Sequence, residues 1–171
     1  MMILISGGNG SGKSAFSECL AAKIDLPRYY IATMVCQSEE NVQRIEKHRR
    51  QRAGLGFQTV EEPCRVSRTA VPADSLVLLE DVSNLLGNLV FQEGGTAEAA
   101  LQEIMSLRET CRVLVAVTIS GLTEDGYDGE TAAYIRDMNW LNEQLLAQAD
   151  LAAELQNGKP VYRKGDWNGL V

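Results

Sequence analysis

Short apolar runs alternate along the chain with longer polar or amphipathic stretches. The apolar runs are rich in β-branched and aromatic residues, as buried strands are, and they cover residues 2–6, 29–33, 75–79 and 112–118. The stretches between them favour helices at about residues 13–24, 38–53, 82–92, 96–110 and 129–148. Strands that alternate with helices predict an α/β fold, a mostly parallel sheet with helices on both faces.

The end of the chain has a different pattern. After Asp150 the sequence becomes short and turn-rich, and Asn157-Gly158 followed by Pro160 predicts a terminal hairpin or an edge strand. The 171 residues are within the usual size of one domain, so we expect a single domain over residues 1–171.

Composition narrows the class of protein. The net charge of -7 would repel a phosphate backbone, so we expect no nucleic-acid partner. The four cysteines form no CxxC pair and the chain has one histidine, which argues against a zinc site and favours reduced thiols. The first apolar run is too short for a signal peptide or a membrane span, so we expect a cytoplasmic protein.

The loop after the first predicted strand carries the strongest chemical signal. It matches the phosphate-binding pattern G-x-x-x-x-G-K-[ST] in full and reads Gly7-Gly8-Asn9-Gly10-Ser11-Gly12-Lys13-Ser14. Glycines allow consecutive backbone N–H groups to point at a β-phosphate. Lys13 is then expected to contact the β- and γ-phosphates, and Ser14 to offer its hydroxyl to Mg²⁺. The loop therefore predicts a P-loop NTPase-like fold that binds a nucleotide.

Such a loop needs an acidic partner at the end of another buried strand. Glu80 is the first carboxylate after the run at 75–79, and we expect it to orient Mg²⁺ directly or through water. Asp81 is the alternative. A strand that simply ends in acidic loop residues is a third possibility.

Residues 44–52 carry five positive charges against one negative in an otherwise acidic chain. An N-cap at Ser38 predicts a helix, and spacings of four then place Arg44, His48 and Arg52 along one stripe, which would suit a triphosphate. Neighbouring arginines would lower the pKa of His48 and favour a neutral imidazole that can attack phosphorus. On composition alone, a solvated helix face with an incidental histidine remains the alternative.

Several blocks together resemble the bifunctional adenosylcobinamide kinase/adenosylcobinamide-phosphate guanylyltransferase family of cobalamin biosynthesis. The pattern Arg-Ile-x-x-His-x-x-x-Arg, at this distance from the phosphate-binding loop, is more specific than the loop itself. The blocks are Ile3-Leu4-Ile5-Ser6-Gly7-Gly8 running into Gly12-Lys13-Ser14, Tyr30-Ile31-Ala32-Thr33, Arg44-Ile45 with His48 and Arg52, Thr59 with Glu61 and Pro63, Leu78-Leu79-Glu80 through Ser83, and Asn88-Leu89-Val90-Phe91.

This resemblance implies a two-step enzyme that uses ATP or GTP with Mg²⁺. The hydroxyl of a corrinoid side chain is phosphorylated, and GMP is then transferred from GTP to that phosphate through a guanylylated histidine, which His48 matches. It also implies a homotrimer. The matching nucleotide contacts, besides the loop at 7–14, are Thr33, Arg49, Arg50, Gln51, Arg52, Glu61 and Glu80.

The resemblance weakens toward the C-terminus. After Thr118 the family usually continues Asn-Glu-Val-Gly, whereas this chain continues Ile119-Ser120-Gly121-Leu122. Two alternatives therefore stay open: a small-molecule kinase with no covalent step, and a nucleotide-binding regulator that has lost catalysis.

Overall fold

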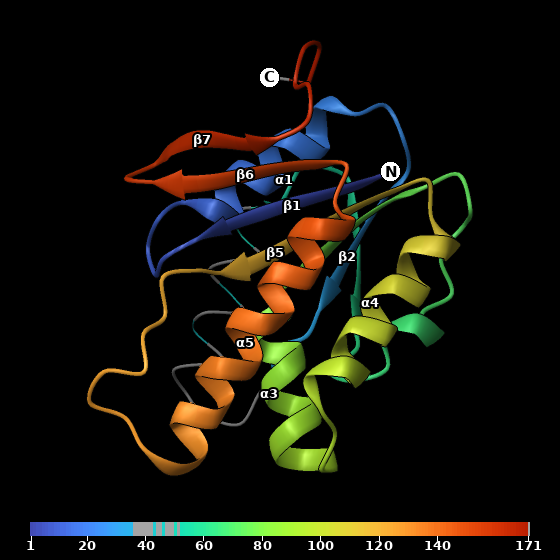
Figure 1. Cartoon of the computed structure of the whole chain (residues 1–171). Coiled ribbons are helices and arrows are strands. Elements are labelled where there is room, and N and C mark those ends of the chain that lie inside the picture. The colour runs from blue at the N-terminus through green and yellow to red at the C-terminus, as the bar shows by residue number, and fades with distance from the viewer. Residues whose placement is uncertain (36–42, 44–45, 47–49, 51, 171) are drawn as a thin grey trace.

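A sheet forms the middle layer of the molecule (Figure 1). The computed structural model describes residues 1–35, 43, 46, 50 and 52–170. Within these residues the sheet has seven strands in the order β3-β2-β4-β5-β1-β6-β7, and of these β7 alone is antiparallel to its neighbour. The strands are β1 (Met2–Gly7), β2 (Arg28–Ala32), β3 (Phe57–Glu61), β4 (Leu76–Glu80), β5 (Val113–Ile119), β6 (Leu151–Gln156) and β7 (Lys159–Lys164).

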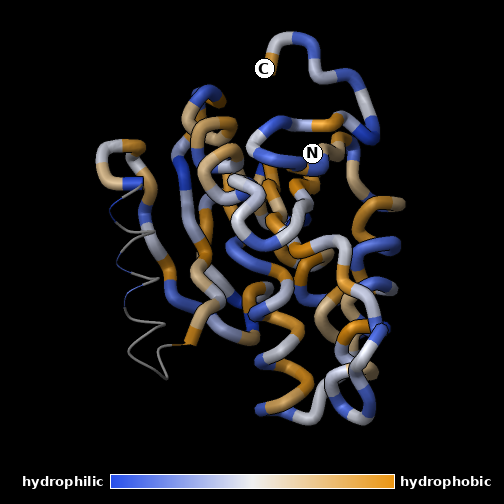
Figure 2. The backbone as a smooth tube through the Cα atoms, turned by 90° about the vertical axis from the view of Figure 1, so that its left-hand side faces the viewer, coloured by the Kyte–Doolittle hydropathy of each residue, from blue (hydrophilic) through white to orange (hydrophobic). Residues whose placement is uncertain are grey.

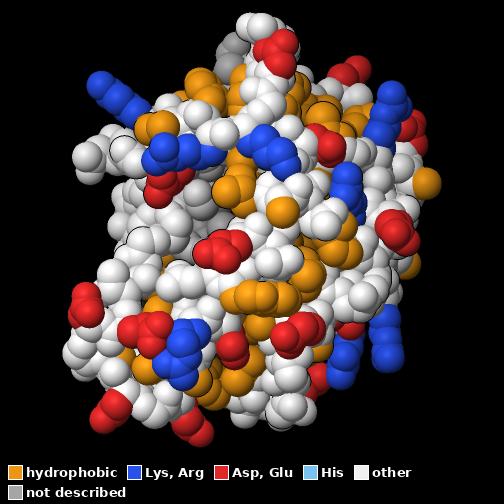
Figure 3. All heavy atoms as spheres, viewed as in Figure 1, with side chains coloured by type: hydrophobic (Ala, Val, Ile, Leu, Met, Phe, Trp, Pro, Cys, Tyr) orange, Lys and Arg blue, Asp and Glu red, His pale blue; other side chains and the backbone are white. Residues whose placement is uncertain are grey.

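Helices cover both faces of this sheet, as the alternating pattern predicts. Figure 1 shows α3, α4 and α5 in front of the sheet, with α1 behind it, and Figure 2 shows hydrophobic positions along the inner strands after a 90° turn. Acidic and basic side chains are interspersed with hydrophobic ones on the front face (Figure 3). The helices are α1 (Lys13–Lys23), α3 (Val82–Glu93), α4 (Ala97–Thr110) and α5 (Gly129–Gln148), with a short 3₁₀ turn η1 (Val66–Arg68).

Alternate residues of the central strands enter two separate hydrophobic clusters. Met2 and Leu4 pack with α3, α4 and α5, whereas Ile3 and Ile5 pack with α1 and Trp167. Successive side chains of a strand point to opposite faces, so a strand covered on both faces must be apolar throughout. This explains why β1, β4 and β5 occur as the continuous apolar runs seen in the sequence.

The strand expectations are confirmed to within about a residue at most ends, but β3 was not expected.

The segment proposed as a helix at 38–53 lies largely outside the described residues. Of its described members, Gln43, Glu46, Arg50 and Arg52 are helical, and Ala53 is in the turn that follows. Among the described residues, no helix is long and apolar enough to cross a membrane.

The predicted terminal hairpin is confirmed by β6 and β7. Asn157 and Gly158 both have positive φ angles, of 51° and 78°, as a tight hairpin turn requires. The N–H of Gly158 donates to the carbonyl of Ser11 at 3.1 Å, so the hairpin tip braces the glycine-rich loop.

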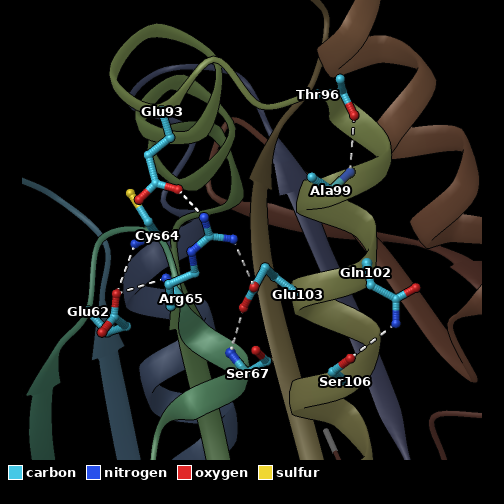
Figure 4. A network of polar contacts seen from close by, with 10 residues as sticks. All are labelled: Glu62, Cys64, Arg65, Ser67, Glu93, Thr96, Ala99, Gln102, Glu103 and Ser106. Carbon is cyan, nitrogen blue, oxygen red and sulfur yellow. Dashed lines mark hydrogen bonds and ion pairs between the residues drawn. The ribbon is translucent and has the colours of Figure 1, made fainter.

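A network around Arg65 fastens the connection between β3 and β4 to the helices on the front face (Figure 4). The Arg65 guanidinium pairs with Glu93 of α3 and with Glu103 of α4, the latter at 3.6 Å. Glu103 also accepts from the Ser67 N–H at 2.9 Å, and Glu62 accepts from the Arg65 N–H at 2.8 Å. The network thus ties this loop to α3 and α4.

Candidate functional site

The glycine-rich loop joins the end of β1 to the start of α1, as its sequence predicts. Gly12, with φ of 88°, occupies the N-cap of α1 and provides no capping side chain, which leaves the first N–H groups of the helix available to an anion. A Cβ on Gly7 would lie 2.5 Å from the Ser11 Oγ and 2.9 Å from the Leu155 carbonyl, so this position requires glycine. Lys13 folds back over the loop, and its Nζ donates to the Gly8 carbonyl at 3.2 Å.

Ser14 and Glu80 meet across the loop. The Ser14 hydroxyl donates to the Glu80 Oε1 at 2.6 Å, and the Glu80 Oε2 is buried with no hydrogen-bond partner among the described residues. Burial, reinforced by the Asp81 charge, raises the pKa of Glu80 to about 8. A hydroxyl beside a carboxylate with a spare oxygen fits Mg²⁺, which prefers oxygen ligands and usually keeps one or two from the protein when bound with phosphates.

No group of three or more His, Cys, Asp or Glu side chains suited to a metal occurs in the described part of the chain.

Thr33 holds the acidic end of β4 in place. Its N–H donates to the Glu80 carbonyl at 3.1 Å, and its hydroxyl exchanges hydrogen bonds with the Asp81 backbone N–H and carbonyl, both at 2.8 Å. Asp81 caps α3, because its Oδ1 accepts from the Asn84 N–H at 2.8 Å and from the Ser83 hydroxyl at 2.7 Å. Thr33 is fully buried and supports the site from beneath.

Arg52 enters the same region from the opposite side. Its guanidinium carbon lies 3.9 Å from the centre of the Tyr30 ring, and its Nη2 donates to the Thr59 hydroxyl at 3.3 Å. The residue is only 6% exposed, yet no carboxylate of a described residue is within ion-pair distance of it.

Glu18 is a second buried carboxylate with an unpartnered oxygen. It lies on α1, is 3% exposed, and its Oε1 has no hydrogen-bond partner among the described residues. Burial raises its pKa, and the nearby Arg52 charge partly opposes that rise. Nothing in the sequence spacing singles out this residue.

Several of these groups line one pocket of about 510 Å³, whereas Glu18 and Thr33 are not part of its lining. It is lined by Asn9, Gly10, Ser11, Gly12, Lys13, Ser14, Ala15, Tyr30, Ala32, Met34, Arg52, Glu80, Asp81, Ser83, Asn84 and Ile119. We call it the phosphate pocket. A smaller hollow, of about 420 Å³, adjoins Arg52 on the β3 side.

About half of the expected site residues line the phosphate pocket. Gly7, Gly8 and Thr33 lie behind the pocket lining rather than in it. Glu61 is at the end of β3 outside the lining, and Arg50 is exposed and pairs with Glu46 at 3.6 Å. The remaining expected residues, His48, Arg49 and Gln51, lie outside the described residues.

The lining also includes residues that the sequence did not single out. Tyr30 belongs to a block that carries the family resemblance, but no spacing gave it a role. Ser83 and Asn84 follow Asp81 in the first turn of α3, so the capping signal at Asp81 could have indicated them.

The end of β5, where the family resemblance weakens, also reaches the pocket through Ile119. Asn142 of α5 secures this end of β5, because it accepts from the Thr118 hydroxyl at 2.6 Å and donates to the Ile119 carbonyl at 2.8 Å. The hydroxyl of Ser120 donates to Glu154 of β6 at 3.1 Å.

Comparisons with known proteins find relatives that match most of the chain. The chain is 28% identical over 174 residues to the bifunctional adenosylcobalamin biosynthesis protein CobP of Pseudomonas aeruginosa, covering 97% of this chain and 99% of that protein. It is 31% identical over 169 residues to the protein CobU of Escherichia coli K12 and 32% identical over 172 residues to that of Salmonella typhimurium LT2. Both alignments cover 88% of this chain and 92% of the relative.

Solved structures support the fold. A protein of Pyrococcus horikoshii OT3 superimposes with a TM-score of 0.50 at 9% identity, covering 99% of this chain and 88% of that one. An ATPase from a bacterial type III secretion system superimposes with a TM-score of 0.50 at 11% identity, covering 91% of this chain and 51% of that one. The fold is thus that of P-loop NTPases.

The model of one protein family matches residues 3–162, which include the whole phosphate pocket. With relatives above 30% identity over most of their length, this match is decisive. The chain belongs to the cobinamide kinase / cobinamide phosphate guanyltransferase family.

Proposed function

We propose that this chain carries out both reactions of its family on a corrinoid substrate. It phosphorylates the side-chain hydroxyl of adenosylcobinamide with ATP or GTP, and it then transfers GMP from GTP to the new phosphate. The observation that carries the proposal is the phosphate pocket, where Lys13, the Ser14–Glu80 pair and Arg52 surround one space large enough for nucleotide phosphates.

In the kinase step, the nucleotide phosphates lie at the N-terminus of α1. Lys13 exchanges the Gly8 carbonyl for the β- and γ-phosphate oxygens, and the N–H groups of residues 10–14 contact the β-phosphate. The corrinoid hydroxyl oxygen attacks the γ-phosphorus while the bond to the β–γ bridging oxygen breaks. The products are the corrinoid phosphate, a nucleoside diphosphate and a proton.

Ser14 and Glu80 would hold Mg²⁺ in this site. When bound, the ion neutralises charge that develops on the phosphates during transfer. Glu80 must be ionised to hold it, and the Ser14 hydroxyl and the Lys13 ammonium both favour the ionised form. Thr33 keeps this carboxylate in position through the Glu80 and Asp81 backbone.

In the second step, an imidazole nitrogen of His48 attacks the α-phosphorus of GTP and pyrophosphate leaves. An oxygen of the corrinoid phosphate then attacks the same phosphorus, which releases the histidine and completes the guanylylated product. Support for this role comes from the family motif and from Arg52, which lies four residues further along and lines the pocket. By the same resemblance, we propose a homotrimer in the cytoplasm, with Arg49, Arg50, Gln51 and Glu61 as further nucleotide contacts.

Labelling with α-³²P-GTP tests the covalent step. Wild-type protein should carry a base-stable, acid-labile label after gel electrophoresis, and His48→Ala should carry none. Lys13→Ala serves as the control for nucleotide binding. It removes a phosphate contact but leaves the His48 imidazole intact, so it separates a loss of label caused by weaker binding from one caused by loss of the nucleophile.

Each alternative function predicts its own result. Nucleotide-dependent phosphorylation of adenosylcobinamide without any protein label would identify a kinase that lacks the covalent step. Tight nucleotide binding without a product would identify a regulator. Either result would overturn the bifunctional proposal.

A further inference from the structure

Arg52 is a buried cation at the wall of the phosphate pocket. A guanidinium carries five N–H donors, and the described residues accept from it once, at the Thr59 hydroxyl. Burying a charge is costly unless an opposite charge pairs with it, yet no described carboxylate does so. A group in this condition at the wall of a pocket is suited to an anionic ligand.

The face of Tyr30 supports this guanidinium. The ring is 3% exposed, and the edge of Phe57 meets it at 82° with the ring centres 6.0 Å apart. In the sheet, Tyr30 pairs with Thr59 of β3 on one side and with Leu78 of β4 on the other. Strand neighbours therefore hold the ring in place, and one face of it remains for Arg52.

We infer that Tyr30 is a positioning residue for nucleotide binding, because its ring holds the Arg52 guanidinium ready at the wall of the phosphate pocket. The inference rests on the proposed function, since it takes the phosphates of a nucleotide as the anion that Arg52 meets. A guanidinium over an aromatic face is attracted by the ring, and the Thr59 hydroxyl fixes its rotation in the plane.

Holding the Arg52 guanidinium in place before the nucleotide binds should increase nucleotide affinity. Arginine has a long side chain with many rotamers. If this side chain becomes ordered only when the nucleotide binds, the lost conformational entropy weakens binding. A guanidinium already held on Tyr30 loses little further freedom. Glu18 is buried nearby on α1, close enough for its charge to interact with that of Arg52.

A double-mutant cycle on the full chain tests this inference, with GTP and Mg²⁺ as the probe. The four proteins are wild type, Tyr30→Leu, Arg52→Met and the double variant, and GTP affinity is measured by titration calorimetry. Tyr30→Leu should weaken GTP binding about tenfold when Arg52 is present and change it little in the Arg52→Met background. Tyr30→Phe should bind GTP like wild type, because it keeps the ring face.

Leu78→Val is the matched control. Leu78 is buried in the same hydrophobic cluster and is paired in register with Tyr30, but it does not line the pocket. It should lower the melting temperature without weakening GTP binding. If Tyr30→Leu does not fold, as judged by circular dichroism, Tyr30→Met replaces it in the cycle.

Two results would overturn the inference alone: equal loss from Tyr30→Leu in both backgrounds, or a loss in Tyr30→Phe as large as in Tyr30→Leu. The first would mean that Tyr30 acts independently of Arg52, and the second that its hydroxyl is what matters. Failure of wild type to bind GTP would instead overturn the proposed function as well, so the two failures are distinguishable.

Discussion

Two arginines of this chain, Arg52 and Arg65, lie in opposite surroundings. Arg65 is 44% exposed and pairs with two glutamates from two helices, so the protein itself supplies its counter-charges. Arg52 is 6% exposed, rests on a tyrosine ring, and has no described carboxylate within ion-pair distance. The carboxylates differ in the same way: Glu103 is satisfied by Arg65 and Ser67, whereas Glu80 keeps an unpartnered buried oxygen.

This comparison distinguishes charged side chains that stabilise the fold from charged side chains that are placed to bind a ligand. Polar groups buried for the fold find partners within the protein, because leaving them unpaired is costly. Unpaired buried groups concentrated around one pocket indicate that something else completes them. Here the Glu80 oxygen without a described partner and the Arg52 guanidinium without a described carboxylate have opposite signs, as a nucleotide with its cation would require.

The largest expected effect comes from Lys13→Ala, which removes the other buried cation of the phosphate pocket. Nucleotide-dependent activity should fall on the order of 100-fold or more, because the lysine contacts the transferring phosphates. The protein should still fold, since the ammonium donates to a loop carbonyl and not to a group of the core. Wild-type turnover in this variant would show that the phosphate pocket does not bind the reacting nucleotide.

Arg52→Met comes next in size. GTP affinity should fall about 10- to 100-fold, the usual range for losing a charged hydrogen-bonding partner. The free energy of unfolding should stay the same or rise, because an apolar side chain of similar volume can replace a buried charge without loss. Calorimetry and chemical denaturation measure the two quantities on one protein sample. A large loss of stability with unchanged affinity would assign Arg52 to the fold, like Arg65.

The unpaired carboxylate should make stability depend on pH. The pKa of Glu80 in the folded protein is about 8, above its ordinary value of 4.5, so between these values the folded state holds a proton that the unfolded state has lost. Metal-free protein should therefore lose stability, by up to about 3.5 kcal/mol, as pH rises from about 5 to 8. Glu80→Gln should reduce this slope when unfolding is followed in EDTA. An identical slope in the variant would place the titrating group elsewhere.

The smallest effect is expected from Arg65→Met, the counterpart of the Arg52 variant. Because the Arg65 pairs are partly exposed, stability should fall by only about 0.5–1 kcal/mol. GTP affinity should not change, since Arg65 does not line the phosphate pocket. Weaker GTP binding in this variant would contradict the assignment of Arg65 to the fold and of Arg52 to nucleotide binding.

The central strands could be predicted because burial on both faces forces a continuous apolar run. The expected runs at 2–6, 75–79 and 112–118 became β1, β4 and β5 with shifts of about one residue at their ends. β3 has no such run, because it is an edge strand with several exposed residues. The order of strands depends on packing between distant segments, and periodicity along the chain carries no record of it.

The site divides in the same way. The glycine-rich loop and Glu80 were predictable because each is contained in a short motif with a defined place after a strand. The association of Tyr30, Arg52 and Glu18 was not, since three separate segments must pack before these residues meet.

Product analysis tests the central claim most directly. Purified protein is incubated with adenosylcobinamide, GTP and Mg²⁺, and the corrinoids are separated and identified by mass spectrometry over time. The account predicts a phosphorylated corrinoid first and its guanylylated form later, with pyrophosphate released alongside. Recovery of unmodified adenosylcobinamide, from protein that is folded and binds GTP, would contradict it.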